Sequence, residues 1–201
     1  MPVQVLGISG SPIRDSNTDR AVQAILAHTG LETEFVKLSE LEFAPCRACL
    51  GCINANECVV LDDARSLAAK FRAAPAFMER MFCFRHRTGG SRGKRGVAVV
   101  TTACPPGAKN VPPAAATALS QIGFWMAEEG IEHLGSLVLE GNLPCIRCGR
   151  GDTCEVSGIK MMHGPDATVA SVGVHTFEED DALVAQAAQL GQALRAAVLE
   201  E

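Results

Sequence analysis

The 201-residue sequence contains no tyrosine, a single tryptophan and only 4% aromatic residues. Proteins that bind single-stranded nucleic acids stack the bases on aromatic side chains, so this composition disfavours that class. The formal net charge is −5. A nucleic-acid surface is normally basic, because it has to neutralise phosphates. The low aromatic content and the negative net charge both disfavour a nucleic-acid-binding protein.

The sequence also lacks an apolar run long enough to cross a bilayer. Its start has no basic segment ahead of the apolar residues, so we expect no signal peptide and a cytoplasmic protein. Histidine is sparse, and no Ser-His-Asp or Cys-His pattern is spaced for hydrolysis. With 47% hydrophobic residues, we expect one globular domain over residues 1–201, whose chemistry comes from cofactors and not from a catalytic side chain.

Cysteine, in contrast, is abundant, with nine residues. An odd count in a chain without a secretion signal favours metal binding over a disulfide framework. Residues 45–62 form a cluster-binding loop with the spacing CxxCxxCx5C, at Cys46, Cys49, Cys52 and Cys58. Iron–sulfur clusters take four thiolates from compact runs of this kind, whereas structural zinc usually uses two separated CxxC pairs. The run therefore favours a 4Fe–4S cluster over zinc or over unligated thiols.

The amino-terminal segment predicts an anion site. Residues 3–9 indicate a buried strand, and residues 19–28 an amphipathic helix. The loop between them is rich in hydroxyl and amide groups, from Ser9, Ser11, Ser16, Asn17 and Thr18. Backbone N–H groups and the helix dipole favour an anion there. The loop lacks the motifs of P-loops and dinucleotide folds, so we expect a monophosphate; the alternative is a polar turn that caps the helix.

The rest of the chain alternates strands and helices. We expect strands over residues 34–38, 96–102 and 131–139, and helices over residues 62–74, 113–129 and 178–199, with a long loop over 157–176. Ligands of open α/β sheets bind beyond the carboxyl ends of the strands. The loop at 9–18 and the cysteine loop at 45–62 should therefore share one edge of the sheet.

A second cysteine loop, residues 143–176, repeats part of the first. Cys145, Cys148 and Cys154 have the CxxCx5C spacing of Cys49, Cys52 and Cys58. Three thiolates predict a candidate second metal site, whose fourth ligand would come from Cys83, Cys104, His163 or a neighbouring subunit. Zinc, a second cluster, a redox-active CxxC pair and free cysteines all remain open.

Together, the run GISGSPIRDSNT at residues 7–18, the strand after it and the CxxCxxCx5C motif resemble the iron–sulfur flavoproteins of the flavodoxin-like NADPH-dependent FMN reductase family. The resemblance implies a doubly wound parallel sheet of five strands in the order 2-1-3-4-5. It also implies FMN with its phosphate in the loop at 9–18, near Arg14, and a 4Fe–4S cluster on the four cysteines. Thr101, Thr102 and Cys104 would be flavin neighbours. The resemblance further implies a homodimer or homotetramer in which the cluster of one subunit faces the flavin of another.

The chain departs from this family at two places. Ile13 stands where the family usually has arginine. The third strand and the loop that packs on the flavin ring are also missing, because residues 71–74 run directly into residues 75–80. A doubly wound sheet cannot skip a central strand. Either a strand-three segment near residues 74–75 is missing from the given sequence, which is the interpretation we favour, or the chain lacks this strand.

The combined hypothesis is an oxidoreductase that uses FMN and a 4Fe–4S cluster and is linked to NAD(P)H or ferredoxin. It would pass electrons between a two-electron donor or acceptor and one-electron carriers, with ferredoxin or a small-molecule acceptor as its partner. One alternative is a zinc-binding structural or interaction protein without flavin. Another is an FMN-dependent NAD(P)H reductase with structural cysteines.

Overall fold

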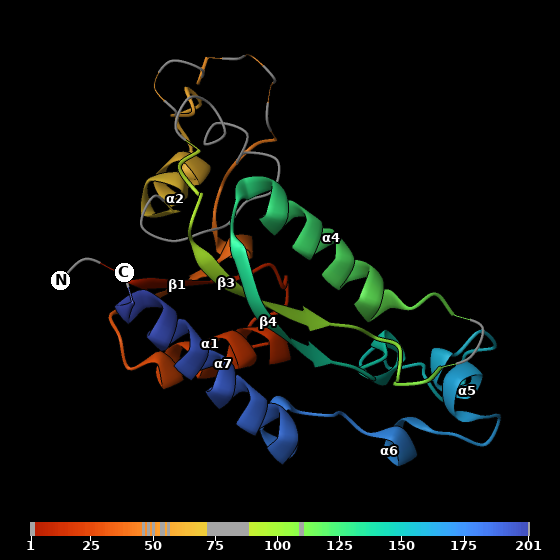
Figure 1. Ribbon diagram of the computed structural model, residues 1–201. Coiled ribbons are helices and arrows are strands. Elements are labelled where there is room, and N and C mark those ends of the chain that lie inside the picture. Colours follow the sequence, from red (N-terminus) through yellow and green to blue (C-terminus); the bar gives the residue numbers. More distant parts are fainter. Residues whose placement is uncertain are drawn as a thin grey trace.

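The computed structural model describes residues 3–45, 47, 49, 51–52, 55, 57–71, 89–108 and 111–200. The strands are β1 (Val5–Ser9), β2 (Thr33–Lys37), β3 (Arg95–Thr101) and β4 (Glu132–Leu139). The α-helices are α1 (Asn17–Thr29), α2 (Asp63–Phe71), α4 (Ala114–Glu129), α5 (Gly158–His163), α6 (Val169–Val172) and α7 (Asp181–Leu199) (Figure 1). Three 3₁₀ turns are η1 (Leu38–Glu40), η2 (Pro144–Ile146) and η3 (Phe177–Glu179).

Most of these elements confirm the sequence-based expectations, and two regions differ. The predicted long loop at 157–176 was wrong, because α5 and α6 lie within it. The last helix begins at Asp181 and not at Glu178. Asp180 caps it, since its carboxylate accepts hydrogen bonds from the amides of Ala182 and Leu183. The final residues of the helix expected over 62–74 lie outside the described residues.

The strands form two parallel pairs. β1 pairs with β2 from Val5 opposite Thr33 to Ser9 opposite Lys37. β3 pairs with β4 from Arg95 opposite Glu132 to Thr101 opposite Leu139, with an irregularity after Gly96. The α/β class with parallel strands is thus confirmed. Within the described residues, however, the strands make two separate two-stranded sheets and no continuous five-stranded sheet.

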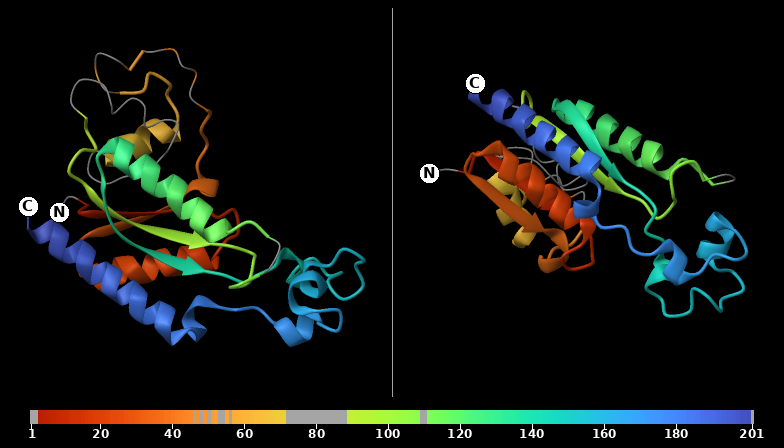
Figure 2. Two further views of the ribbon diagram at one scale, coloured as in Figure 1. Left: turned by 45° about the vertical axis from the view of Figure 1, so that its right-hand side comes forward. Right: turned by 90° about the horizontal axis from the view of Figure 1, so that it is seen from below.

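A shared helical layer joins the two sheets. α1 and α7 run side by side and cover one face of both pairs, while α4 covers the opposite face of β3 and β4 (Figure 2). The main core lies beneath α1 and α7. Ala21 and Leu137 are completely buried there, and so is Ala187. The amphipathic helix expected over residues 19–28 is confirmed, because its apolar residues on one face are all buried: Ala21, Val22, Ile25 and Leu26.

The other two long helices bury only part of their apolar residues. On α7, Ala187, Leu190 and Leu194 are buried, but Ala182 is exposed. On α4, Met126 is the buried apolar residue, whereas Trp125 and its neighbours Leu119 and Ile122 are half-buried. The outer helix α4 therefore contributes less to the core than α7 does.

A cavity separates the two sheets. It has a volume of about 240 Å³ and lies between residues 4–8, in and beside β1, and residues 94–97 and 99, in and beside β3. We call it the β1–β3 slot. In a doubly wound sheet of order 2-1-3-4-5, the central third strand lies beside strand one. The slot therefore lies where the strand missing from the sequence was expected.

No helix among the described residues is long and apolar enough to cross a membrane.

Leu137 provides a test of the core beneath α1 and α7. Its side chain is 0% exposed, so Leu137→Ala leaves a cavity that its packed neighbours cannot fill. We expect the free energy of unfolding to fall by about 2–5 kcal/mol, measured by urea denaturation. The matched variant Leu61→Ala removes a side chain that is 81% exposed, and it should change the free energy by less than about 0.5 kcal/mol. Equal effects of the two variants would contradict the described core.

Candidate functional site

An ion pair buried beneath the loop after β1 holds that loop in shape. Lys37, the last residue of β2, places its Nζ 2.7 Å from a carboxylate oxygen of Asp19, and these side chains are only 6% and 4% exposed. The same ammonium group donates to the carbonyl oxygens of Ser11, at 2.8 Å, and Ile13, at 2.9 Å. Because one cation binds both the loop and the first turn of α1, the conformation of the loop depends on this pair.

Asp19 stays ionised although it is buried. Burial alone would raise the pKa of its carboxyl group. Hydrogen bonds from the Lys37 ammonium, the Ser9 hydroxyl and the Ser16 amide, together with the charge of Lys37, outweigh burial and hold the pKa below its ordinary value of 3.8. The ion pair as a whole is neutral. An anion that approaches the loop therefore meets no uncompensated negative charge beneath it.

The first turn of α1 is capped as the sequence indicated. The Ser16 hydroxyl accepts the Asp19 amide at 3.1 Å, and the Asp19 carboxylate accepts the Ser16 amide at 2.9 Å. The helix begins at Asn17, two residues earlier than expected. The amides of Asn17 and Thr18 thus belong to the first turn, where N–H groups have no partner within the helix. Such amides and the helix dipole can hold a phosphate group.

Two of the predicted phosphate ligands have structural roles instead. The Ser9 side chain is 0% exposed, and its hydroxyl donates to the Asp19 carboxylate while accepting the Ser11 amide. Asn17 holds a distant segment, because its side-chain amide donates to the carbonyl oxygen of His175 at 2.7 Å and accepts the Phe177 amide at 3.2 Å. These side chains shape the site and are not free to point at a ligand.

The remaining predicted residues lie nearer the surface. Arg14 is exposed, and Ser11 and Thr18 are half-buried. The Thr18 hydroxyl lies 2.9 Å from the hydroxyl of Thr101 at the end of β3. This hydrogen bond joins the first turn of α1 to the carboxyl end of β3.

Beyond β3, the chain turns back at Thr102 and Cys104, both half-buried. The Thr102 hydroxyl donates to the carbonyl oxygen of Cys104 at 3.3 Å. The Thr102 amide donates to the carbonyl oxygen of Leu139, at the end of β4. The three predicted flavin neighbours Thr101, Thr102 and Cys104 therefore lie together at the edge that carries the loop at 9–18.

A cavity of about 610 Å³ opens beside this edge. Asn142 and Asn17 both bind the backbone of His175, which forms part of its wall. Its volume is in the range of cofactor and ligand pockets. The wall carries four carboxyl groups, from Glu140, Glu179, Asp180 and Asp181. Hydrogen bonds from the Thr176 hydroxyl and amide lower the pKa of Glu179. An acidic wall would repel phosphate, so the cavity suits an uncharged group better.

The first cysteine loop is closed at its base by two acidic residues. The Asp62 carboxylate accepts the Ala44 amide at 3.2 Å, and the Asp63 carboxylate accepts the Glu42 amide at 2.8 Å. Within the loop, a Cβ atom at Gly51 would lie 2.9 Å from the methyl groups of Val59. Because position 51 is glycine, its backbone can lie close to the Val59 side chain. This close approach brings together the two parts of the chain that carry Cys52, next to Gly51, and Cys58, next to Val59.

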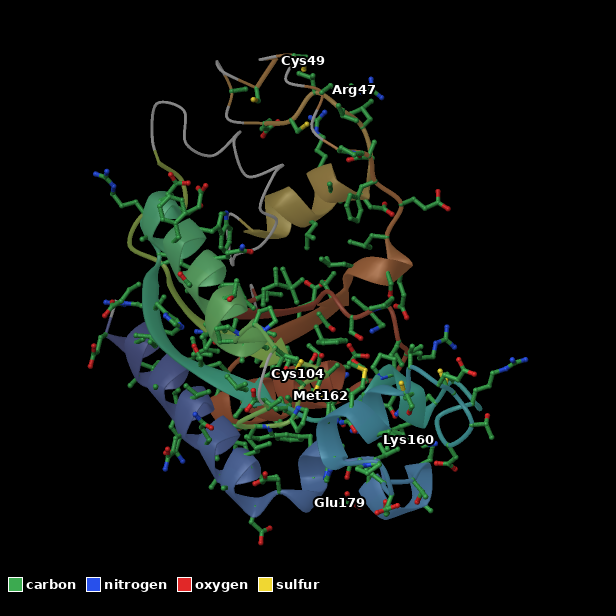
Figure 3. The ribbon with its side chains drawn as sticks, turned by 90° about the vertical axis from the view of Figure 1, so that its right-hand side faces the viewer. Arg47, Cys49, Cys104, Lys160, Met162 and Glu179 are labelled. Atoms are coloured by element: carbon green, nitrogen blue, oxygen red, sulfur yellow. The ribbon has the colours of Figure 1, made fainter. Side chains whose placement is uncertain are left out.

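The described cysteines of this loop differ in exposure. Cys49 is exposed, Cys52 and Cys58 are half-buried, and Cys46 lies outside the described residues. Figure 3 shows Cys49 at the top of the molecule and Cys104 near its centre. The segment that leads into the cysteine loop lies near the loop at 9–18, because the Ser39 hydroxyl donates to the carbonyl oxygen of Ser11 at 3.4 Å. The expected shared edge is therefore only partly realised, because the loop extends away from it.

In the second cysteine loop, backbone amides already bind two of the sulfur atoms. The Gly158 amide donates to Cys145 Sγ at 3.2 Å, and the Arg150 amide donates to Cys148 Sγ at 3.4 Å. Cys154 is half-buried, and its amide donates to the carbonyl oxygen of Arg150. The Cys148 thiol in turn donates to the carbonyl oxygen of Cys145 at 3.3 Å, so the backbone of the loop holds both sulfur atoms.

The described part of the chain contains no group of three or more His, Cys, Asp or Glu side chains arranged to hold a metal ion. Of the predicted fourth ligands for the second loop, His163 lines the 610 Å³ cavity and Cys83 lies outside the described residues. Both predicted metal ligand sets therefore stay predictions.

Sequence reasoning identified the loop at 9–18 but missed the lysine that holds it. Lys37 ends a strand whose last two residues are buried, and it is itself 7% exposed. A lysine is almost never buried without a partner. Two features of the sequence could have revealed the buried role of Lys37. One is its position directly after a buried apolar residue, and the other is Asp19 in the first helical turn.

The amino-terminal part of the chain is similar to known proteins. Residues 3–78 match the family of NADPH-dependent FMN reductases. An iron–sulfur flavoprotein of Methanocaldococcus jannaschii is 37% identical over 75 residues, and one of Methanosarcina thermophila is 39% identical over 75 residues. Each alignment covers 36% of this chain and 39% of the relative's length. No solved structure matches the chain. These matches confirm, for the amino-terminal part of the chain, the resemblance to iron–sulfur flavoproteins.

The buried ion pair predicts the effect of removing its cation. Lys37→Met leaves Asp19 buried without a counter-charge, so we expect the free energy of unfolding at pH 7 to fall by about 3–5 kcal/mol. Adding Asp19→Asn to this variant should recover much of the loss, because no isolated charge remains. As a control, Glu178→Gln removes a partner of Arg20 that is 53% exposed, and it should cost at most about 1 kcal/mol.

The same pair predicts a dependence on pH. The folded-state pKa of Asp19 is lower than its ordinary value of 3.8, so its contribution to stability is present above pH 3.8. The contribution is lost as the pH falls through the folded-state pKa, when the carboxylate becomes protonated. We therefore expect the stability difference between the wild type and Lys37→Met/Asp19→Asn to be constant near neutral pH and to shrink below pH 3.8. A difference that grows on acidification would contradict this account.

Proposed function

We propose that this chain is a flavin-dependent oxidoreductase that binds FMN at the carboxyl edge of β1 and β3 and a 4Fe–4S cluster on the first cysteine loop. The observation that carries the proposal is the neutral Lys37–Asp19 pair beneath the first turn of α1. It lies within residues 3–78, which match a family of FMN reductases.

In this proposal the FMN phosphate is held by groups around the start of α1. The first-turn amides of Asn17 and Thr18, the hydroxyl of Ser11 and the guanidinium of Arg14 are the donors nearest the surface. Ser9, Ser16 and Lys37 fix the loop from below. An anion gains from the helix dipole only if Asp19 beneath it is neutralised, and Lys37 supplies that neutralisation.

The flavin ring would extend from this loop past Thr101, Thr102 and Cys104 toward the 610 Å³ cavity. The acidic wall of the cavity favours this orientation, because it would repel the phosphate and tolerate an uncharged ring. A bound flavin accepts two electrons as hydride, whereas an iron–sulfur cluster passes them one at a time. The role of the chain's own groups is to position the cofactor.

The cluster would be held by Cys46, Cys49, Cys52 and Cys58. The two ends of the loop are held together by hydrogen bonds from the amides of residues 42 and 44 to the carboxylates of Asp63 and Asp62, respectively. The exposed Cys49 lies far from Cys104 (Figure 3), so the cluster and the flavin edge of one chain are widely separated. We infer that the protein acts as a homodimer or homotetramer in which the cluster of one subunit approaches the flavin of another.

The remaining parts of the proposal follow the family resemblance. A fifth, central strand would complete the order 2-1-3-4-5. The electron donor would be NAD(P)H or ferredoxin, the acceptor a one-electron carrier or a small molecule, and the compartment the cytoplasm. Cys145, Cys148 and Cys154 would form a second metal site for zinc or a second cluster. The backbone amides that bind Cys145 and Cys148 support that assignment.

Cofactor analysis of anaerobically purified protein tests this function. We expect FMN and, for one cluster on four thiolates, about four iron atoms with acid-labile sulfide per chain. Zinc without flavin would show the interaction protein instead, and flavin without iron would show a reductase with structural cysteines. Either result would overturn the combined function.

A pair of glycine variants tests the cluster loop separately. Gly51→Ala places a methyl group against Val59, so the loop has to open and iron content should fall at least about twofold while FMN is retained. Gly123→Ala, in α4, meets no atom within 4 Å and should change neither cofactor. Unchanged iron in Gly51→Ala would place the cluster elsewhere.

A further inference from the structure

Two asparagine side chains fix the backbone of His175 at the wall of the 610 Å³ cavity. The side-chain amide of Asn142 donates to the carbonyl oxygen of His175 at 2.7 Å, and the side-chain oxygen of Asn142 accepts the His175 amide at 3.0 Å. The side-chain amide of Asn17 donates to the same carbonyl oxygen at 2.7 Å. His175 is exposed, so these hydrogen bonds, and not burial, define the place from which its imidazole extends.

These hydrogen bonds connect His175 to both ends of the proposed flavin site. Asn17 belongs to the first turn of α1, which would hold the phosphate. At the other end, the Gly141 amide donates to the carbonyl oxygen of Thr102 at 3.2 Å, and a Cβ atom at Gly141 would lie 3.7 Å from Cδ2 of His175. The imidazole ring therefore lies against the backbone that binds Thr102, one of the predicted flavin neighbours.

The wall of this cavity is rich in negative charge. Besides Glu179, its carboxyl groups come from three residues: Glu140, Asp180 and Asp181. The described residues of the wall include no lysine and no arginine, so His163 and His175 are the side chains there that can carry a positive charge. Hydrogen bonds from Thr176 lower the pKa of Glu179, and the charge of His175 lowers it further. The imidazole of His175 therefore interacts with an acidic surface.

A flavin ring bound in this cavity would need a counter-charge when it is reduced. Reduction adds electron density to the ring nitrogens, and nearby charges tune the potential of the ring. The carboxylates of the wall oppose that change, because like charges repel. A protonated imidazole offsets these carboxylates, and both of its nitrogens donate hydrogen bonds. His175 is held beside the predicted flavin neighbours, whereas His163 ends α5 in the second cysteine loop.

From these observations we propose that His175 contacts the bound FMN ring and supplies the positive charge that stabilises its reduced form. No bond to His175 forms or breaks in this role. The two electrons come from the donor of the proposed function and enter the ring, while the imidazole keeps its proton and donates a hydrogen bond. This inference rests on the proposed function and adds to it a residue that tunes the potential of the cofactor.

Redox titration of the FMN-loaded protein tests the charge. His175→Gln keeps a hydrogen-bond donor but cannot become positive. We expect this variant to bind reduced FMN at least about 10-fold more weakly relative to oxidised FMN, which lowers the two-electron potential by about 30 mV. The loss should be larger at about pH 6 than at about pH 9, because histidine generally loses its charge within this range.

Two further histidine variants complete the comparison. His133→Gln removes an exposed histidine of β4 that lies outside the cavity, and it should leave the ratio of the two FMN affinities unchanged. An equal loss in His163→Gln would show that the net charge of the cavity sets the potential, which would contradict a specific role of His175. An unchanged potential in His175→Gln would contradict it as well.

Imidazole NMR signals provide a readout that does not depend on electron transfer. The chain has five histidines, and the variants assign the signals of His163 and His175. FMN titrated into the flavin-free full chain should shift the His175 signals in a saturable manner. Asn142→Ala removes two of the three hydrogen bonds to the His175 backbone, so it should reduce that shift. FMN that binds without shifting these signals would overturn the role of His175 alone, whereas FMN that does not bind would overturn the proposed function with it.

Discussion

The buried contact between Lys37 and Asp19 is the constraint on which the candidate site depends. It joins the end of β2, the loop after β1 and the first turn of α1 through one ammonium group. Two isolated charges would be costly to bury, and each removes that cost for the other. The result is a helix amino terminus whose nearest carboxylate is neutralised. An acidic residue in the first helical turn can thus cap α1 without repelling an anionic ligand.

The same loop connects the two halves of the molecule. Thr18 reaches Thr101 on the second sheet, and Asn17 reaches the segment before α7. α1 and α7 pack closely and cover both strand pairs, so the helical layer is continuous although the sheet is not. No backbone hydrogen bonds between the described strands join the two sheets. The candidate site at the carboxyl edge is therefore held together by side-chain contacts and by the packing of the helices. The β1–β3 slot is the consequence of this missing connection.

Several features could be predicted from the sequence because they depend on local pattern. The apolar spacing of α1 predicted an amphipathic helix, which its buried face confirms. The parallel strands followed from short β-branched runs. The cysteine spacing indicated ligand number and type but not position, because spacing does not determine where a long loop extends. Cys49 thus lies far from the edge that was expected to hold it (Figure 3).

Other features depend on contacts between distant residues. The roles of Ser9 and Asn17 changed from ligands to supports because their partners lie at Asp19 and His175. The helices α5 and α6 have six and four residues, too few for a helical period to appear in the sequence. The partner of Lys37 lies 18 residues away in the chain, on a different element, so the local pattern around Lys37 indicates that it is buried but does not identify Asp19 as its partner.

The central claim is that the neutralised start of α1, together with the end of β3, forms the FMN site. Amide hydrogen exchange of the full chain with and without FMN measures this directly. We expect FMN to slow exchange at residues 10–18 and 101–104 and to leave the second cysteine loop unchanged. Slower exchange elsewhere, with no change at residues 10–18, would contradict the account.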